Sequence, residues 1–347
     1  MGRRSDGAMD FSLIIPCFNE RENIPALFPA LVSCFDDLNF SCELVFVDDG
    51  SSDGTAVAIR DEIDAYRNDP EVSGRISFKV VEFSRNFGKE AAMFAGLERS
   101  SGDVLGFIDA DMQQDPSIAL KMYRMLRDDS SIDCVAAVQE RRRESLLLRA
   151  CKRLFYRMFR DMSDLDIVEG ASDFRVFRRD VANALLSMRE RFRFSKGMFS
   201  WVGFKTRVIT YQAHERLAGE SKWTLGNLVS YAWNGVVAFS TWPLRAVMYL
   251  GIALAVISIV LFLVDVVDSL VVKDGLSTGR LLIYVVLLVS GIQMVVLGVF
   301  GEYLARAYIE SKQRPIYIAR REYEVAAGRV EDGSGAGAEA DDEAAPC

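Results

Sequence analysis

The sequence predicts an α/β fold in which a mixed, mainly parallel sheet is followed by helices at a membrane interface and a transmembrane hairpin of two helices. Three observations lead to this prediction. Short apolar runs alternate with stretches of helical pattern over the first 140 residues. Polar, acidic segments end several of those runs, and two long uncharged segments occur in the last third of the chain. Strands separated by helices favour a parallel sheet with helices on both faces.

The apolar runs and helical stretches give the expected order of the elements. Strands are expected at residues 11–16, 43–47, 76–83, 104–108 and 134–138. Helices are expected at residues 24–38, 55–67 and about 89–100. Ligands of such sheets bind beyond the carboxyl ends of the strands. Polar segments stand at three of these ends, at residues 16–20, 48–54 and 109–111, and their coincidence favours a binding site there.

Two carboxylates one residue apart follow the strand at residues 104–108. Asp109 and Asp111 would present hard oxygen ligands at the edge of the sheet. A Mg²⁺ or Mn²⁺ ion that carries a diphosphate binds through one or two carboxylates and the substrate phosphates. The alternative is an ordinary solvated loop. The acidic strand end upstream and the apolar segments downstream favour the metal site.

Residues 48–54, with the sequence DDGSSDG, allow two interpretations. They form a tight turn capped by Asp and Ser, which a strand-to-helix junction requires. They also place a carboxylate where it could accept hydrogen bonds from a ribose hydroxyl or a base N–H. No GxGxxG segment follows the first strand, which disfavours a dinucleotide-binding domain, and the sequence contains no GxxxxGK[ST], which excludes a P-loop NTPase.

Composition excludes several classes of function. The net charge of -8 argues against a nucleic-acid-binding protein, which usually carries a basic excess. The six cysteines show no metal-type spacing and are expected to be reduced thiols of a cytosolic compartment. The single histidine, His214, excludes histidine triads and zinc sites with several histidines. The polar residues 1–10 do not resemble a cleavable signal peptide.

Two apolar segments in the last third of the chain are expected to cross a membrane. They cover residues 246–264 and 281–301, and a helix needs about 20 such residues to cross a bilayer. Buried helices of a soluble domain are the alternative. Two spans form a hairpin with both flanks on one side, and five basic residues follow the second span: Arg306, Lys312, Arg314, Arg320 and Arg321. The positive-inside rule then places the large N-terminal domain and the C-terminus in the cytoplasm.

The chain is accordingly divided into five parts. Residues 1–222 form the catalytic domain, and residues 223–243 form amphipathic helices at the interface, where Trp and Tyr are favoured. Residues 244–304 hold the two spans, at about 246–267 and 281–303, and residues 305–325 form a cytoplasmic juxtamembrane segment. Residues 326–347 are rich in Ala, Gly, Asp and Glu and are expected to be disordered.

A basic segment at residues 141–160 also allows two interpretations. Its arginines and lysine could be a solvated helix face, which is common for runs of charge. Interleaved leucines and aromatic residues make the segment amphipathic, and a basic amphipathic helix beside a membrane anchor suits anionic lipid head groups. The second interpretation is favoured.

Several segments resemble a known family. Residues 11–20 (FSLIIPCFNE), 47–55 (VDDGSSDGT) and 109–113 (DADMQ) resemble family 2 glycosyltransferases, which have the GT-A (Rossmann-like) fold. Residues 85–90 (RNFGKE), 172–175 (SDFR), 193–197 (RFSKG) and 218–223 (AGESKW) are similar to polyprenyl-phosphate glycosyltransferases. These are the bactoprenol glucosyltransferase relatives of dolichol-phosphate mannose synthase. The resemblance runs from about Asp10 to Ile318.

The resemblance implies roles for individual residues, by position. The nucleoside pocket would be lined by Pro16, Phe18, Glu20 and Asp49, and the metal and diphosphate would be held by Asp109, Asp111 and Gln113. A loop with Arg216, Ser221 and Lys222 would close over the donor, and the catalytic residues would be Asp111, Asp173 and Arg216. The acceptor phosphate would bind Arg85, Lys89, Arg141, Arg149 and Arg153. Many relatives have arginine where this chain has Gln139, so Arg141, Arg142 or Arg143 could supply that contact instead.

The resemblance implies an inverting transfer of one sugar, glucose, from a UDP-sugar to undecaprenyl phosphate with Mg²⁺ or Mn²⁺ as cofactor. Other donors stay open: UDP-galactose, UDP-GlcNAc, UDP-GalNAc and GDP-mannose. The acceptor is an anion at pH 7, so no strong general base is needed, which suits a chain with one histidine. A tetramer in the bacterial plasma membrane and a separate flippase are also expected. A processive synthase would carry more spans and a Gln-x-x-Arg-Trp motif, and a non-catalytic scaffold that binds nucleotide sugars would be expected to lack Asp109 or Asp111.

Overall fold

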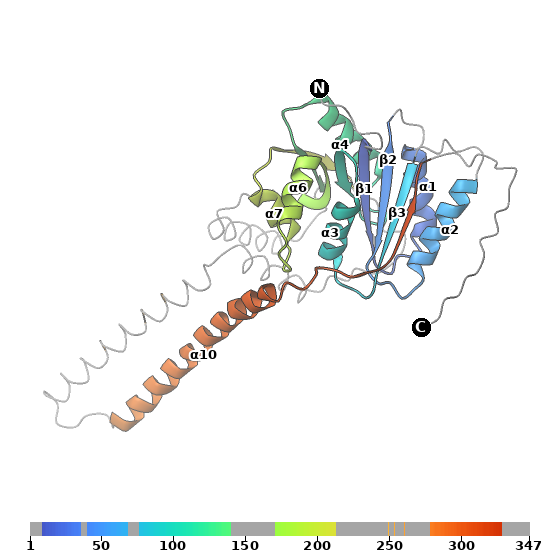
Figure 1. The fold of residues 1–347 in the computed structure, drawn as a ribbon. Coiled ribbons are helices and arrows are strands. Elements are labelled where there is room, and N and C mark those ends of the chain that lie inside the picture. The colour runs from blue at the N-terminus through green and yellow to red at the C-terminus, as the bar shows by residue number, and fades with distance from the viewer. Residues whose placement is uncertain are drawn as a thin grey trace, which may run out of the picture.

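A mixed sheet forms the centre of the catalytic domain (Figure 1). The computed structural model describes residues 9–35, 40–68, 76–139, 171–212 and 278–327, and the isolated residues Tyr249, Ala253 and Val260. Within these residues the sheet has eight strands in the order β7-β5-β6-β4-β1-β2-β3-β8. This is the mixed α/β arrangement expected from the sequence.

The five strands predicted from apolar runs are all present. They are β1 (Phe11–Cys17), β2 (Cys42–Asp48), β3 (Ile76–Phe83), β4 (Val104–Phe107) and β5 (Cys134–Gln139). β1 pairs in parallel with β2 and β4, and β2 pairs in parallel with β3. Their continuous apolar sequences reflect burial on both faces, as parallel strands require. The carboxyl ends of β1, β2 and β4 therefore meet at one edge of the sheet.

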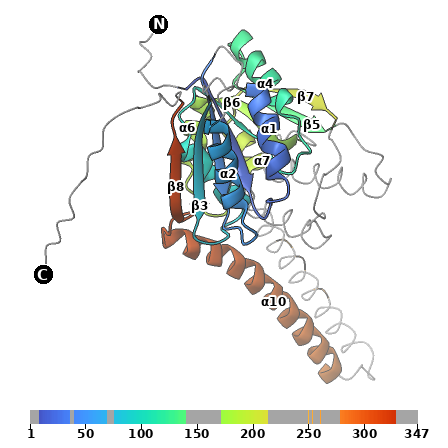
Figure 2. The same cartoon turned by 90° about the vertical axis from the view of Figure 1, so that its right-hand side faces the viewer.

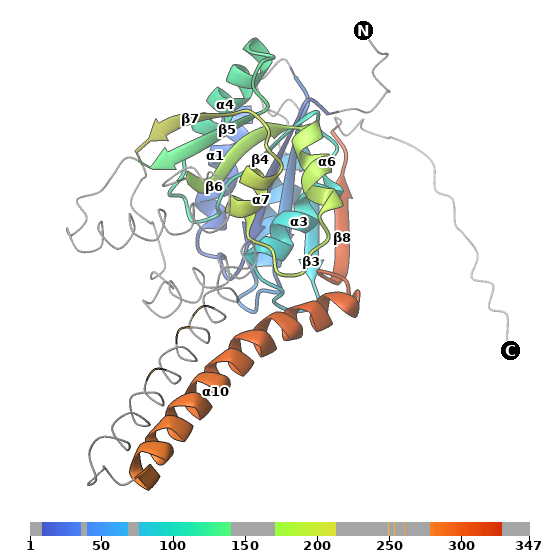
Figure 3. The same cartoon turned by 90° about the vertical axis from the view of Figure 1, so that its left-hand side faces the viewer.

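Helices cover both faces of the sheet (Figure 3). The core on one face contains residues of α1 (Ile24–Phe35), α2 (Thr55–Asn68) and α4 (Pro116–Asp128), packed with Leu13 and Ile15 of β1. The other core contains residues of α3 (Lys89–Arg99), α6 (Arg179–Ser187) and α7 (Ser195–Trp201), packed with Ile14. Alternate residues of β1 thus enter opposite cores, as the two-residue period of a strand dictates. The predicted helices are confirmed as α1, α2 and α3, although the assigned α1 ends at Phe35 and residues 36–39 lie outside the described part of the chain.

Two further strands extend the sheet beyond β4 and were not predicted. β6 (Ala171–Arg178) lies antiparallel between β4 and β5, and β7 (Thr206–Tyr211) pairs in parallel with β5. β6 carries Arg175, whose side chain is buried with its guanidinium 4.5 Å above the ring of Phe199. A buried charged residue interrupts the apolar pattern by which strands are found, so β6 escaped prediction.

The segment that follows α10 (Thr278–Ser311) returns to the catalytic sheet. β8 (Ala319–Val325) pairs antiparallel with β3 and forms the edge of the sheet beside it (Figure 2). The division drawn from sequence placed residues 305–325 in a cytoplasmic juxtamembrane segment, and β8 lies within that range. The four charged side chains of β8 concealed the strand, although charge is typical of an edge strand. The ring of Tyr317 stacks on Phe83, which joins the two elements further.

α10 is a continuous helix of 34 residues that contains the second predicted span. It projects away from the sheet (Figures 1 and 2). No helix among the described residues meets the criteria of length and apolarity for a membrane span. The interface helices at 223–243, the tail beyond residue 327 and, except for Tyr249, Ala253 and Val260, the first predicted span lie outside the described residues. The hairpin stays a prediction.

We expect truncation after Pro315 to destabilise the catalytic domain. The truncated chain lacks β8 and Tyr317, which exposes the edge of β3 and the face of Phe83. Losing the burial of Phe83 and of the Tyr317 ring stacked on it should lower the free energy of unfolding by roughly 3 kcal/mol. This lowers the melting temperature by about 6–12 °C. Truncation after Ala327 is the control and should change neither the melting temperature nor the catalytic rate. Equal melting temperatures for the two truncated chains would contradict the role assigned to β8.

Candidate active site

Acidic residues from three strands gather at the carboxyl edge of the sheet. Asp48 ends β2 and Asp49 follows it, and both side chains are buried. Asp109 and Asp111 follow β4, and Asp173 lies in β6, the antiparallel neighbour of β4. The structure therefore brings an acidic residue of an unpredicted strand to the predicted strand ends.

Lys89, the first residue of α3, joins two of these carboxylates. Its Nζ lies 2.5 Å from Oδ1 of Asp109 and 3.1 Å from Oδ2 of Asp173. The side chain of Lys89 is 45% exposed, and those of Asp109 and Asp173 are 30% and 20% exposed. The cluster is thus accessible to a ligand. Lys89 was expected to bind the acceptor phosphate, but here its ammonium group contacts two carboxylates.

The charges of the cluster stabilise one another. Burial alone would lower the pKa of Lys89, but the carboxylates of Asp109 and Asp173 outweigh it and raise the pKa. Burial alone would raise the pKa of Asp173, but Lys89 and Lys196 hold it below its usual value. Oδ1 of Asp173 is buried and accepts no hydrogen bond from the described residues. A buried acceptor without a partner costs free energy, so a further hydrogen-bond donor at this oxygen would stabilise the cluster.

Gln114 positions Asp109 and was not anticipated from the sequence. Its Oε1 accepts a hydrogen bond of 3.0 Å from the backbone N–H of Asp109, and its Nε2 donates one of 3.2 Å to Oδ2 of the same residue. The Gln114 side chain is buried, so the pair is shielded from water. The predicted ligand Gln113 donates its backbone N–H to Oδ1 of Asp111 at 3.2 Å. Gln114, and not the predicted Gln113, is therefore the glutamine whose side chain orients the carboxylate of Asp109.

Asp109 and Asp111 fit a divalent cation that arrives with a diphosphate. The described residues contain no group of three or more His, Cys, Asp and Glu side chains arranged to hold a metal. Such an ion takes only one or two carboxylates from the protein and completes its shell with phosphate and water oxygens. The hard oxygens of these two aspartates meet that requirement. The cation beside Asp109 in this structure is the ammonium group of Lys89.

Asp49 holds the loop that presents Lys89. Its Oδ1 accepts the backbone N–H of Phe87 at 2.6 Å, and its Oδ2 accepts that of Gly88 at 2.9 Å. Burial raises the pKa of Asp49 to about 6, although these two hydrogen bonds favour the carboxylate. Gly50 has φ +67°, and a Cβ there would lie 2.4 Å from the carbonyl carbon of Arg85. A larger residue at position 50 would therefore displace the same loop.

The loops after β1 and β2 are hydrogen-bonded to each other. The backbone N–H of Asn19 donates to Oγ of Ser51 at 2.9 Å, and that of Glu20 donates to Oγ1 of Thr55 at 2.9 Å. Oε2 of Glu20 accepts from the Asn23 amide at 2.5 Å. The predicted nucleoside residues Phe18 and Glu20 thus lie on a loop fixed to the one that carries Asp49, and Pro16 lies in β1 just before that loop.

Not all predicted residues join the cluster. Arg85 is exposed, with its guanidinium 4.0 Å above the ring of Phe87 and its Nη1 2.8 Å from the carbonyl oxygen of Asn86. Lys196 and Glu90 were not predicted, but both interact electrostatically with Asp173. Six predicted residues lie outside the described part of the chain: Arg141, Arg149, Arg153, Arg216, Ser221 and Lys222.

We expect Asp49→Asn to change the pH dependence of stability. The raised pKa means that the folded state favours protonated Asp49, so this contribution is complete below about pH 4 and is lost as the pH rises through about 6. Wild-type protein should therefore lose about 2–3 kcal/mol relative to the variant over this range. Melting curves between pH 4 and 7 measure this, and parallel curves would contradict it. The hold on the backbone of Phe87 and Gly88 should also weaken in the variant, because the asparagine amide cannot accept both backbone N–H groups.

Comparison with known proteins identifies relatives over most of the chain. The model of glycosyl transferase family 2 matches residues 12–186. A putative glycosyltransferase, CsbB, from Bacillus subtilis is 35% identical over 89% of this chain and 91% of its own. A prophage bactoprenol glucosyl transferase homolog from Escherichia coli is 37% identical over 90% of this chain and 99% of its own. Among solved structures, glucosyl-3-phosphoglycerate synthase from Mycobacterium tuberculosis is 17% identical with a TM-score of 0.43, over 67% of this chain and 79% of that one.

Proposed function

The chain is a glycosyltransferase of family 2, and we propose on this basis that it transfers one glucose from a UDP-sugar to undecaprenyl phosphate at a membrane. The observation that carries the proposal is the cluster of Asp109, Asp173 and Lys89 at the carboxyl edge of the sheet. The names of the relatives, which include a bactoprenol glucosyl transferase homolog 37% identical to this chain, support the choice of sugar and acceptor.

The donor would bind with its nucleoside near Pro16, Phe18, Glu20 and Asp49 and its diphosphate near Asp109. A Mg²⁺ or Mn²⁺ ion held by Asp109 and Asp111, with Gln113 beside them, would stabilise the charge that develops on the leaving diphosphate. We also assign Arg216, Ser221 and Lys222 to the donor diphosphate. Gln114 fixes the carboxylate of Asp109 for this role.

The acceptor needs orientation rather than deprotonation. A lipid phosphate is already an anion at pH 7, and its oxygen would attack the anomeric carbon on the side opposite to the leaving UDP. The bond from the sugar to phosphate oxygen forms as the bond to UDP breaks, so the configuration inverts. Asp173 would orient the acceptor or the sugar, since its Oδ1 has no hydrogen-bond partner among the described residues.

A membrane anchor completes the proposal. Apolar side chains of α10 are exposed, among them Leu282, Val286, Leu297 and Phe300 at 54–63%. Their exposure is unfavourable in water and would be relieved in lipid. We propose that α10 and residues 246–267 form the hairpin, with the catalytic domain and C-terminus on the cytoplasmic face of a bacterial plasma membrane. Assembly as a tetramer and delivery of the product to a separate flippase belong to the same proposal.

Purified protein and separate donors test the reaction. The protein in detergent would be incubated with undecaprenyl phosphate, Mg²⁺ or Mn²⁺, and one of UDP-glucose, UDP-galactose, UDP-GlcNAc, UDP-GalNAc or GDP-mannose. Mass spectrometry of the lipid and the release of nucleoside diphosphate are the two readouts. A glucosylated lipid from UDP-glucose alone supports the proposal, and a product from another donor corrects the sugar. Release of diphosphate without a lipid product contradicts the acceptor, and no turnover with any donor contradicts the reaction.

A further inference from the structure

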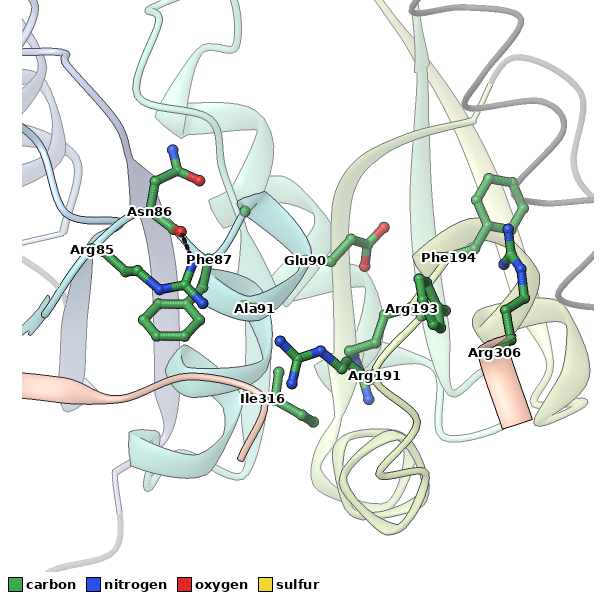
Figure 4. A pocket seen from close by; sticks show the side chains of 12 residues that line it. Arg85, Asn86, Phe87, Glu90, Ala91, Arg191, Arg193, Phe194, Arg306 and Ile316 are labelled. Atoms are coloured by element: carbon green, nitrogen blue, oxygen red, sulfur yellow. Dashed lines mark hydrogen bonds between the residues drawn. The ribbon is translucent and has the colours of Figure 1, made fainter. Parts of the chain in front are cut away.

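A basic pocket lies at the junction of the sheet domain and α10 (Figure 4), and its lining residues Gly88 and Glu90 flank Lys89 in the chain. It is a cavity of about 380 Å³ bounded by the loop after β3, the segment before α7 and the end of α10. Glu90 is the one acidic residue of the described lining. Four arginines line the cavity: Arg85, Arg191, Arg193 and Arg306. None of Asp109, Asp111 and Asp173 lines this cavity, so it is separate from the catalytic carboxylates.

Three of the four guanidinium groups lie over aromatic rings. Arg85 stacks on Phe87, as described above, and Arg193 lies 4.5 Å from the ring centre of Phe94. Arg306 lies 4.8 Å from the ring centre of Phe192. Cation–π contacts restrict the rotamers of these side chains before any ligand binds. Guanidinium groups fixed in this way match the oxygens of a phosphate with little further loss of entropy.

The pocket carries more positive than negative charge. Glu90 already accepts the backbone N–H of Ser195 at 3.0 Å and the hydroxyl of the same residue. Glu302 accepts from Nε and Nη2 of Arg306 at 3.0 and 2.9 Å. Two of the arginines, Arg85 and Arg191, have no acidic partner in the described ion pairs. Four arginines around one cavity repel one another, and an anion in the cavity would relieve that repulsion.

The position of the pocket along α10 matches the head-group level of a bilayer. Leu297, Phe300 and Leu304 are 56–60% exposed, and Arg306 follows two residues later. At a rise of about 1.5 Å per residue, Arg306 lies roughly 3 Å along the helix axis beyond Leu304, the last of these exposed apolar residues. The polar layer on each side of the hydrocarbon core is about 5–8 Å thick. A pocket at Arg306 therefore lies where lipid phosphates lie, if α10 spans as proposed.

We propose that this pocket binds the phosphate group of an anionic membrane lipid. The inference rests on the proposed membrane anchor. The phosphate could belong to a diester, as in phosphatidylglycerol, or to the monoester of undecaprenyl phosphate on its way to the catalytic cluster. In either case Arg191 is a principal contact. Its backbone N–H is already held by Oε1 of Glu310 at 2.8 Å, so changing its side chain leaves that hydrogen bond intact.

Lipid retention by the full-length protein tests the pocket. Wild type, Arg191→Gln and Arg191→Lys would be reconstituted in nanodiscs of phosphatidylcholine with phosphatidylglycerol, with undecaprenyl phosphate, or with both at equal mole fraction. Native mass spectrometry after release from the discs counts the anionic lipid retained. Arg191→Gln should retain it about tenfold less than wild type, because one charge-assisted contact is lost. Arg191→Lys, which keeps the charge, should fall between the two. Arg67→Gln, on the exposed surface of α2, is the matched control and should behave as wild type.

The outcomes distinguish the two possible lipids, and they distinguish failure of the pocket from failure of the proposed reaction. Displacement of phosphatidylglycerol by undecaprenyl phosphate assigns the pocket to the acceptor, and retention of phosphatidylglycerol in its presence assigns it to bulk lipid. Equal retention by wild type and Arg191→Gln, with both eluting as the same folded species, overturns the pocket. Sugar transfer measured in the same discs is independent. Absent transfer with retention that depends on Arg191 would refute the reaction alone, and normal transfer with equal retention would refute the pocket alone.

Discussion

Asp111→Asn should lower the rate of sugar transfer by about 10³-fold while the protein folds normally. Asparagine preserves the acceptor for the Gln113 N–H, so the turn after β4 is kept. It removes a negative charge from the pair that fits a divalent cation. Loss of one group that stabilises developing charge costs roughly 10²–10³ in rate, and a weakened metal adds to this. The measurement is transfer to the lipid acceptor at saturating UDP-sugar, with thermal unfolding recorded on the same sample.

A matched variant shows whether the loss of rate comes from removing a charge at the site or from changing the net charge of the protein. Asp61 is exposed on α2, and Asp61→Asn makes the same chemical change away from the strand ends. It should transfer sugar at the wild-type rate. Mn²⁺ binding followed by electron paramagnetic resonance gives a readout that does not depend on turnover. If Asp111→Asn binds Mn²⁺ as tightly as wild type in the presence of UDP, Asp111 is not a ligand and the assignment is wrong.

The elements that could be predicted from sequence are those whose pattern is local. The strands β1 to β5 are apolar runs because both of their faces are covered, and the helices α2 and α3 begin and end at polar residues. β8 could not be found in this way. An edge strand is less covered than a central strand, and the four charged side chains of β8 also suit a solvated segment. Only the pairing with β3, over 200 residues earlier in the chain, shows that it is part of the sheet.

Individual residues of the site were predicted from sequence, but the contact of Lys89 with Asp109 and Asp173 was not. Asp109 and Asp173 were each assigned roles, but their approach depends on β6 entering the sheet antiparallel beside β4. Lys89 was expected to bind the acceptor phosphate because of the resemblance to polyprenyl-phosphate glycosyltransferases. Its contact with two carboxylates depends on where α3 begins, and that is set by Asp49 through the backbone of Phe87 and Gly88. The partners of a charged side chain follow from tertiary structure, which a local pattern does not encode.

The contact of Lys89 with Asp173 gives the second large effect, on both activity and stability. Lys89→Met removes the largest influence that holds the pKa of Asp173 down, and burial then raises that pKa. We expect transfer to fall about 100-fold, because Asp109 and Asp173 lose their common partner. The free energy of unfolding at pH 7 should fall by about 1–3 kcal/mol. This lies between the values for exposed and buried ion pairs, since Lys89 is 45% exposed.

The pH dependence of the Lys89→Met effect identifies its cause. In wild type the lowered pKa of Asp173 contributes stability above about pH 4 that is lost as the pH falls through the folded pKa. In the variant the raised pKa reverses this, so stability is lost as the pH rises from about 4. The difference in melting temperature should therefore widen between pH 4 and pH 7. Lys121→Met, on the exposed face of α4, is the control and should show no such trend. A difference that stays constant over this range would mean that Lys89 acts through packing and that its charge on Asp173 is immaterial.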